Sequence, residues 1–197
     1  MKTNNLRSNG TSHRVQRLAK MGMMAAVACV IGLIRFPLIP GVSFLTYDLA
    51  DIPILVTTFA FGVLPGMLLL AVVSFIQAFL MGGDGVYGFV MHIIASGSFL
   101  IVAGLFYQRH KTKKVAVISM VVASFVMTAI MICANYFVTP LFLGTPKDVV
   151  VALLPYIGLF NLIKGGLNSI ITFVVYKRIS KFLHAEGMIS TREKQPE

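Results

Sequence analysis

Long apolar segments alternate with short basic segments along this chain of 197 residues, and this pattern limits the possible folds more than any other feature. Hydrophobic residues make up 57% of the chain and charged residues 12%, whereas a soluble domain carries about 25% charged residues. Apolar segments of this length are typical of helices that cross or enter a bilayer. The sequence therefore predicts an all-α integral membrane protein.

Six apolar segments predict a six-transmembrane-helix bundle. They cover residues 20–39, 52–62, 67–81, 87–107, 115–138 and 149–176. The second segment is too short to cross a hydrocarbon core of about 30 Å squarely. Asp51 is expected to cap its first turn and Pro53 to follow within that turn. We expect one membrane domain at 20–183, a flexible basic tail at 1–19 and a second tail at 184–197.

The positive charges gather in three short stretches between or beside the apolar segments. Fourteen of the seventeen Lys and Arg residues lie in residues 2–20, 109–114 or 177–194. Six crossings place these three stretches on the same side, and the positive-inside rule makes that side cytoplasmic. Asp48, Asp51, Asp84 and Asp148 then fall on the outer side. The net charge of +10 thus indicates topology and contact with anionic headgroups rather than nucleic-acid binding.

Lys164 lies near the middle of the sixth apolar segment, far from either end. A lysine at that depth costs about 2.5–3.5 kcal/mol on insertion scales, so it requires a partner, a water-filled cavity or a ligand. Asn161, Lys164 and Asn168 follow i, i+3, i+7 spacing and share one helix face. That face is expected to point into the bundle, where Asn168 either binds a ligand or bonds to a neighbouring helix.

Other polar or small residues stand out within the apolar segments. Gln77 and His92 lie at depth, and His92 has no second histidine or carboxylate at metal-binding spacing, so no metal site is predicted. The turn around Gly83 is glycine-rich and could allow close approach of a ligand. Gly22 with Ala26, and Ala28 with Gly32, form pairs of small residues that favour close helix contact, either inside the bundle or with another subunit.

Motifs for catalysis or ATP hydrolysis are not found in the sequence. It contains no Gly-x-x-x-x-Gly-Lys-[Ser/Thr] loop, no His-Glu-x-x-His and no Gly-x-Ser-x-Gly. We therefore expect neither an enzyme nor an ATPase in this chain.

Several short stretches, in this order, carry a resemblance to a known family. They are residues 35–37 (Arg-Phe-Pro), 45–53 (Leu-Thr-Tyr-Asp-Leu-Ala-Asp-Ile-Pro), 88–92, 135–137 (Asn-Tyr-Phe) and 160–165 (Phe-Asn-Leu-Ile-Lys-Gly). Over residues 21–183 the chain resembles the S components of energy-coupling factor (ECF) vitamin transporters, and among them the riboflavin-specific members.

The resemblance implies a fold, a function and partners. Family members are six-helix bundles with cytoplasmic termini and a vitamin site near the outer face, under the loop that is residues 40–50 here. It implies a high-affinity riboflavin-binding subunit of the cell membrane, without a cofactor of its own. A transmembrane coupling subunit and two cytoplasmic ATPase subunits would be its partners, and Gly22, Ala26 and Ala28 would face the coupling subunit.

By residue match, the resemblance makes Asn135, Asn161 and Lys164 ligands of the flavin. Amide and ammonium groups suit the donors and acceptors of its pyrimidine edge, and Phe44, Tyr47 and Phe160 could cover its ring faces. The full set of candidate substrate-binding residues is Phe44, Tyr47, Asp48, Gly83, His92, Asn135, Phe160, Asn161, Lys164 and Asn168. Two alternatives stay open: another vitamin or a flavin analogue such as FMN, and a stand-alone structural or enzymatic membrane protein.

Overall fold

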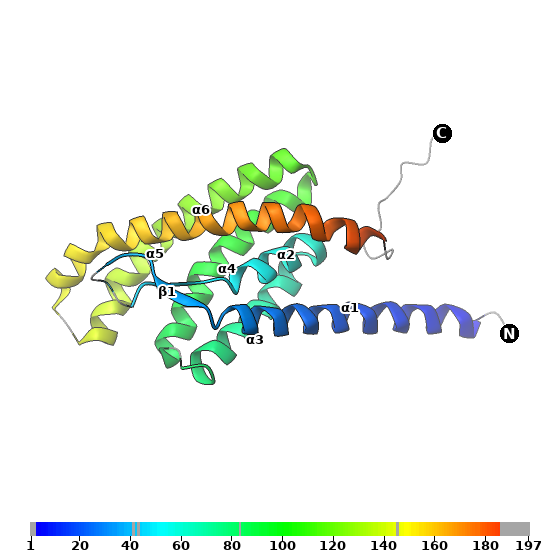
Figure 1. The fold of residues 1–197 in the computed structure, drawn as a ribbon, viewed down its shortest axis with the longest axis horizontal. Helices are drawn as coiled ribbons and strands as arrows, with labels where there is room; N and C mark the ends of the chain where they lie inside the picture. Colours follow the sequence, from blue (N-terminus) through cyan, green and yellow to red (C-terminus); the bar gives the residue numbers. More distant parts are fainter. Residues whose placement is uncertain (1–2, 41, 43, 83, 145, 186–197) are drawn as a thin grey trace.

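The computed structural model describes residues 3–40, 42, 44–82, 84–144 and 146–185, and these form a bundle of six helices with one small hairpin (Figure 1). The helices are α1 (Thr3–Ile31), α2 (Asp51–Phe61), α3 (Val63–Phe79), α4 (Gly85–Arg109), α5 (Lys113–Leu143) and α6 (Lys147–Ala185). The strands are β1 (Arg35–Pro37) and β2 (Thr46–Asp48). Each predicted apolar segment corresponds to one helix.

The first helix differs from its predicted bounds at both ends. It begins at Thr3, inside the stretch expected as a flexible tail, and it ends at Ile31 instead of residue 39. Residues 35–37 pair antiparallel with residues 46–48, with Phe36 opposite Tyr47. The helix closes in a tighter turn, in which the amides of Leu33 and Ile34 donate to the carbonyls of Val30 and Ile31, and Pro37 then suits the extended strand that follows. The predicted C-terminal tail lies almost wholly outside the described residues.

Two predicted loops are shifted for reasons of local backbone geometry. The turn expected between the second and third apolar segments lies at its early end, at Gly62. The φ of Gly62 is +107°, a backbone conformation that favours glycine. Pro65 then lies in the first turn of α3, where its missing N–H costs no helical bond. The loop expected after residue 138 starts later, because α5 continues through Pro140 to Leu143 and is capped by Gly144, with a φ of +61°.

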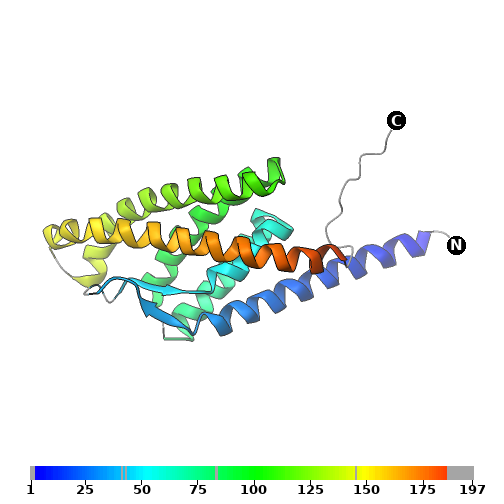
Figure 2. The ribbon, with the colours of Figure 1, turned by 45° about the horizontal axis from the view of Figure 1, so that its top comes forward.

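The connections sort to two ends of the molecule (Figures 1 and 2). The start of α1, the α2–α3 turn, the α4–α5 connection and the end of α6 lie toward one end, which we call the basic end. The β1–β2 hairpin and the turns α3–α4 and α5–α6 lie toward the other, which we call the hairpin end. This sorting is what an even number of passes through a layer produces.

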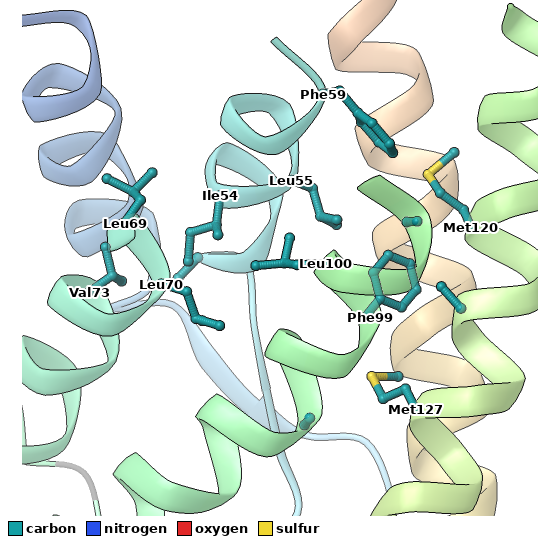
Figure 3. Close-up of a cluster of buried hydrophobic side chains, with 14 of the residues drawn as sticks. Ile54, Leu55, Phe59, Leu69, Leu70, Val73, Phe99, Leu100, Met120 and Met127 are labelled. Atoms are coloured by element: carbon teal, nitrogen blue, oxygen red, sulfur yellow. The ribbon is translucent and has the colours of Figure 1, made fainter. Parts of the chain in front are cut away.

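The main core joins α2, α3, α4 and α5. Figure 3 shows side chains from these four helices meeting between the ribbons. The labelled members are Ile54, Leu55, Phe59, Leu69, Leu70, Val73, Phe99, Leu100, Met120 and Met127. A second cluster packs the hairpin segment against α6, through Tyr47, Ile157 and Phe160 among others. Strand pairing therefore holds β1 and β2 together, and apolar contact holds the hairpin on α6.

The outer surface of the bundle is apolar. On α3, for example, Leu64, Leu68, Val72, Phe75 and Phe79 are all exposed along one side of the helix. Helices α4, α5 and α6 are each long and apolar enough to cross a membrane, and α2 and α3 are shorter apolar helices. Such a surface suits surrounding lipid and would be unfavourable in water.

A glycine substitution tests the packing of α4. A Cβ added at Gly104 would lie 2.6 Å from Cγ2 of Val63 and 2.9 Å from Cγ2 of Thr58, whereas one added at Gly166 would have no atom within 4 Å. We expect Gly104→Ala to lower the free energy of unfolding by about 1–3 kcal/mol through overpacking. The matched control Gly166→Ala should leave it unchanged or slightly raised. Thermal unfolding in detergent measures both, and equal midpoints would contradict this packing.

Candidate functional site

A buried carboxylate, Asp51, lies at the centre of a polar network inside the bundle. Its side chain is 3% exposed. Oδ2 lies 3.0 Å from Nζ of Lys164 and accepts a hydrogen bond from Nδ2 of Asn168 at 3.0 Å. Oδ1 accepts from Oγ of Ser96 at 2.7 Å and lies 3.0 Å from Nε2 of His92. Four side chains from α4 and α6 thus surround one carboxylate at the start of α2.

His92 extends this network to α3. Its Nδ1 lies 3.1 Å from the hydroxyl of Ser74, while its Nε2 faces Asp51. A neutral ring with its proton on Nε2 satisfies both contacts, donating to Asp51 and accepting from Ser74. With His92 neutral, the charges of Asp51 and Lys164 cancel. The network as a whole is then neutral, as a buried cluster in a membrane requires.

Tyr47 of β2 ties the hairpin to the same network. Its hydroxyl donates to Oδ1 of Asn168 at 2.9 Å, and its ring packs edge-on against Phe36 of β1 at a centroid distance of 5.5 Å. Burial first, and then the nearby charges of Asp51 and Asp48, raise the pKa of Tyr47 to about 12. The phenol therefore remains a neutral donor to Asn168 throughout the physiological range.

A cavity of about 140 Å³ opens above this network, toward the hairpin end. Its polar lining comes from six elements, β1, β2, α3, α4, α5 and α6, and includes both charged and amide side chains. The lining residues that bear on function are Arg35, Phe44, Asp48, Gln77, Asp84, Tyr87, His92, Asn135, Phe160, Asn161 and Lys164. One wall is thus made by the hairpin segment, and the floor by the groups that surround Asp51.

Two buried amide atoms beside this cavity have no hydrogen-bond partner among the described residues. They are Oδ1 of Asn161, an acceptor, and Nε2 of Gln77, a donor. The other amide atom of Asn161 donates to the carbonyl of Ile157 at 2.8 Å, which holds the side chain in place. A buried polar atom without a partner costs about 1–3 kcal/mol. A ligand in the cavity that bonds to these atoms would remove that cost.

Asn135 is held by a second chain of hydrogen bonds on α5. Its Nδ2 donates to the carbonyl of Met131 at 2.8 Å, and its Oδ1 accepts from Thr139 at 2.7 Å. The hydroxyls of Thr139 and Tyr87 are 3.1 Å apart, and the Tyr87 ring stacks on Phe142 with centroids 3.7 Å apart. Asn135 is therefore a fixed group on the part of the cavity wall that α5 contributes.

The structure brings most of the predicted binding residues to this one cavity. Phe44, Asp48, His92, Asn135, Phe160, Asn161 and Lys164 line it. Tyr47 and Asn168 do not line it, but bond to one another behind it. Gly83 lies outside the described residues.

The three residues of α1 that were predicted to face a partner differ in exposure. Gly22 and Ala26 are exposed, but Ala28 is 0% exposed and packs in the main core. Ala28 is therefore covered inside the chain and does not lie on the exposed side of α1 with Gly22 and Ala26. Its small side chain instead allows close packing inside the chain.

The sequence did not predict Asp51 as the buried partner of Lys164, and it gave Gln77 no role in the site. Asp51 was predicted as a helix cap on the outer side, but Ala50 holds that position and no side chain caps α2. The available signal was Lys164, because a buried cation needs an anion and Asp51 is one of two aspartates, with Asp148, that directly precede an apolar segment. No group of three or more His, Cys, Asp or Glu that could hold a metal is present in the described part of the chain.

Comparison with known proteins agrees on one family. The family model for "ECF transporter, substrate-specific component" matches residues 16–176. The riboflavin transporter RibU of Staphylococcus aureus (strain TCH60) is 31% identical over 175 residues, covering 85% of this chain and 92% of that protein. The riboflavin transporter FmnP of Bacillus subtilis (strain 168) is 26% identical over 188 residues, covering 88% and 96%.

A solved structure of the S component of a bacterial ECF transporter has a similar fold. It superposes with a TM-score of 0.76 at 32% identity, covering 86% of this chain and 98% of that one. The likeness therefore covers most of the chain and supports the fold of an ECF S component.

The ion pair between Asp51 and Lys164 can be tested by removing one charge at a time. We expect Asp51→Asn to lower the free energy of unfolding by about 3–5 kcal/mol, because it leaves a buried ammonium without its anion. The double variant Asp51→Asn/Lys164→Met should recover much of the loss. Asp84→Asn, at an exposed carboxylate beside the same cavity, is the control. Denaturant unfolding without ligand measures all three, and an undestabilised Asp51→Asn variant would contradict the assignment.

Proposed function

The chain belongs to the family of ECF transporter substrate-specific components, and we propose that it is a high-affinity riboflavin-binding subunit for vitamin uptake across the cell membrane. The relatives described above are riboflavin transporters and match this chain over most of its length. Its apolar exterior and three long apolar helices support a place in the membrane.

The composition of the cavity is the observation that supports riboflavin most directly. A flavin has a flat ring with acceptors and an N–H donor on its pyrimidine edge. The unpaired Oδ1 of Asn161 could accept from that N–H, and Lys164 could donate to a ring oxygen. An ammonium carries three donors, so its contact with Asp51 does not exhaust Lys164. Phe44 and Phe160 offer apolar surface to the ring faces.

The neutral network beneath the cavity also suits a neutral ligand. Asp51 already balances Lys164, so a neutral ring can bond to the ammonium without leaving a net buried charge. Asn135, on the α5 part of the cavity wall, would hold a second edge of the ligand. Tyr47 and Asn168 would act indirectly, because they position the hairpin and Asp51 instead of lining the cavity.

The cavity must widen when a vitamin binds. Its volume of about 140 Å³ is below the roughly 300–1,000 Å³ typical of small-molecule sites. The hairpin segment forms one wall and is joined by a ladder of only three residue pairs. We propose that this segment, with Phe44, moves to admit the ligand, while the helical walls stay in place.

We further propose six membrane-embedded helices with both termini in the cytoplasm. The domain would be residues 20–183, with α1 continuing from the membrane into its basic N-terminal part. The basic end then faces the cytoplasm, where positive charge is favoured, and the hairpin end with its cavity faces outside. A vitamin arriving from outside would meet Arg35, Asp48 and Asp84 first.

Energy for uptake would come from other subunits, because the chain shows no ATP-binding motif. We propose a transmembrane coupling subunit and two cytoplasmic ATPase subunits as partners, as is typical of the family. The exposed Gly22 and Ala26 of α1 would allow the coupling subunit to approach closely. These residues lie one helical turn apart on one side of α1.

Flavin binding by the purified protein tests the proposal. Titration with riboflavin should give saturable fluorescence quenching near one ligand per chain, without ATP. Asn161→Ala should weaken binding by about 5- to 150-fold, equivalent to 1–3 kcal/mol for a lost buried hydrogen bond.

Asn168→Ala is the matched control. It removes the same amide group two helical turns further along α6, where the residue does not line the cavity. It should affect thermal stability more than affinity. A folded protein that ignores riboflavin but binds FMN or another vitamin would change the substrate, whereas unchanged affinity in Asn161→Ala would overturn the site.

A further inference from the structure

An apolar groove runs along the outer surface between α5 and α6, on the half of the bundle nearest the basic end. Its volume is about 470 Å³, and it shares no lining residue with the vitamin cavity. Val117 and Phe125 mark its extent on α5, and Leu162 and Val174 mark it on α6. Nothing in the proposed uptake function uses this groove.

Two successive glycines of α6 explain why the groove exists. A Cβ at Gly165 would lie 2.6 Å from Oγ of Ser124, so this glycine lets the two helices touch. A Cβ at Gly166 would meet nothing within 4 Å, so this glycine leaves the space beside the contact empty. The hydroxyls of Ser124 and Ser169 bond to carbonyls of their own helices. The groove therefore presents almost only carbon surface.

The length of the groove matches one leaflet of a bilayer. From Val117 to Phe125 a helix rises about 12 Å, and from Leu162 to Val174 about 18 Å. Half of a hydrocarbon core of about 30 Å is about 15 Å. An acyl chain reaching from the membrane surface to the midplane would thus be covered along its whole length.

Positive charge lies where the headgroup of such a lipid would be. Lys113 and Lys114 are exposed in the first turn of α5, four and three residues before Val117. Residues spaced in this way share a helix face, so both lysines continue the groove's α5 wall toward the membrane surface. A basic site beside a cleft between membrane helices is typical of binding to anionic lipid headgroups.

We propose that this groove is a binding site for one anionic phospholipid, with an acyl chain along α5 and α6 and its phosphate near Lys113 and Lys114. The inference does not depend on riboflavin being the transported vitamin. It requires only that the bundle is embedded in a bilayer with the basic end at one surface. A bound lipid would fill the space that Gly166 leaves and stabilise the α5–α6 contact.

Native mass spectrometry of the delipidated full-length chain tests the proposal, using phosphatidylglycerol and phosphatidylcholine with identical acyl chains. We expect one phosphatidylglycerol per chain to be retained in preference to phosphatidylcholine. The variant Lys113→Gln/Lys114→Gln should lose about fivefold in phosphatidylglycerol affinity for each lysine, from about 1 kcal/mol per charge. Gly166→Leu, which fills the groove, should abolish retention of both lipids.

Two controls separate a filled groove from a misfolded protein. Gly22→Leu adds the same side chain at another open position on the surface and should retain the lipid. Riboflavin affinity should be unchanged in all three variants if the protein binds that vitamin, and the unfolding midpoint reports folding if it does not. The lysine variant remains informative even if Gly166→Leu fails to fold, because both lysines are exposed.

Three results would overturn the proposal. Equal retention of the two lipids would show ordinary bulk-lipid contact without a headgroup site. Retention of phosphatidylglycerol in folded Gly166→Leu would place the lipid elsewhere. Self-association that Gly166→Leu abolishes would show that a second copy of the chain occupies the groove.

Discussion

The ion pair between Asp51 and Lys164 is the interaction on which the rest of the structure depends. Asp51 begins α2 only three residues after β2 ends, so anchoring it to α6 also anchors the hairpin. His92 and Ser96 add α4 to the same carboxylate. In a membrane interior each of these groups would be costly alone. Because each group supplies what another lacks, helices far apart in the chain are held in one arrangement.

The rest of the helix packing can be explained by a lipid environment instead of water. Lipid is as apolar as leucine, so burying leucine does not drive membrane helices together as it does in water. Close contact and polar bonds take over that role. Gly104 lets α4 approach the α2–α3 turn, Gly165 lets α6 approach α5, and Ala28 lets α1 enter the core. Large apolar side chains can then cover the outer face, as they do along α3.

The same polar network serves stability and the candidate site. Lys164, Asn161 and His92 line the cavity, and two of them also bond within or beside the Asp51 cluster. Oδ1 of Asn161 and Nε2 of Gln77 have no hydrogen-bond partner among the described residues, so both atoms could bond to a ligand in the cavity. A rigid floor with an unpaired acceptor, facing a thin hairpin wall, is an arrangement that can select a ligand and still admit it.

The sequence by itself determined the six helices, the basic end and the need of Lys164 for a buried partner, because the length of apolar segments and the cost of a buried charge act locally. It did not predict Asp51 as the partner of Lys164, the strands that shorten α1, or the burial of Ala28. Those depend on contacts between residues that are not neighbours in the sequence, from the strand pair Phe36 and Tyr47 to Asn168 and Asp51, which are more than a hundred positions apart. Only the tertiary structure decides such contacts, since local sequence fixes which groups need a partner but packing decides which partner comes within reach.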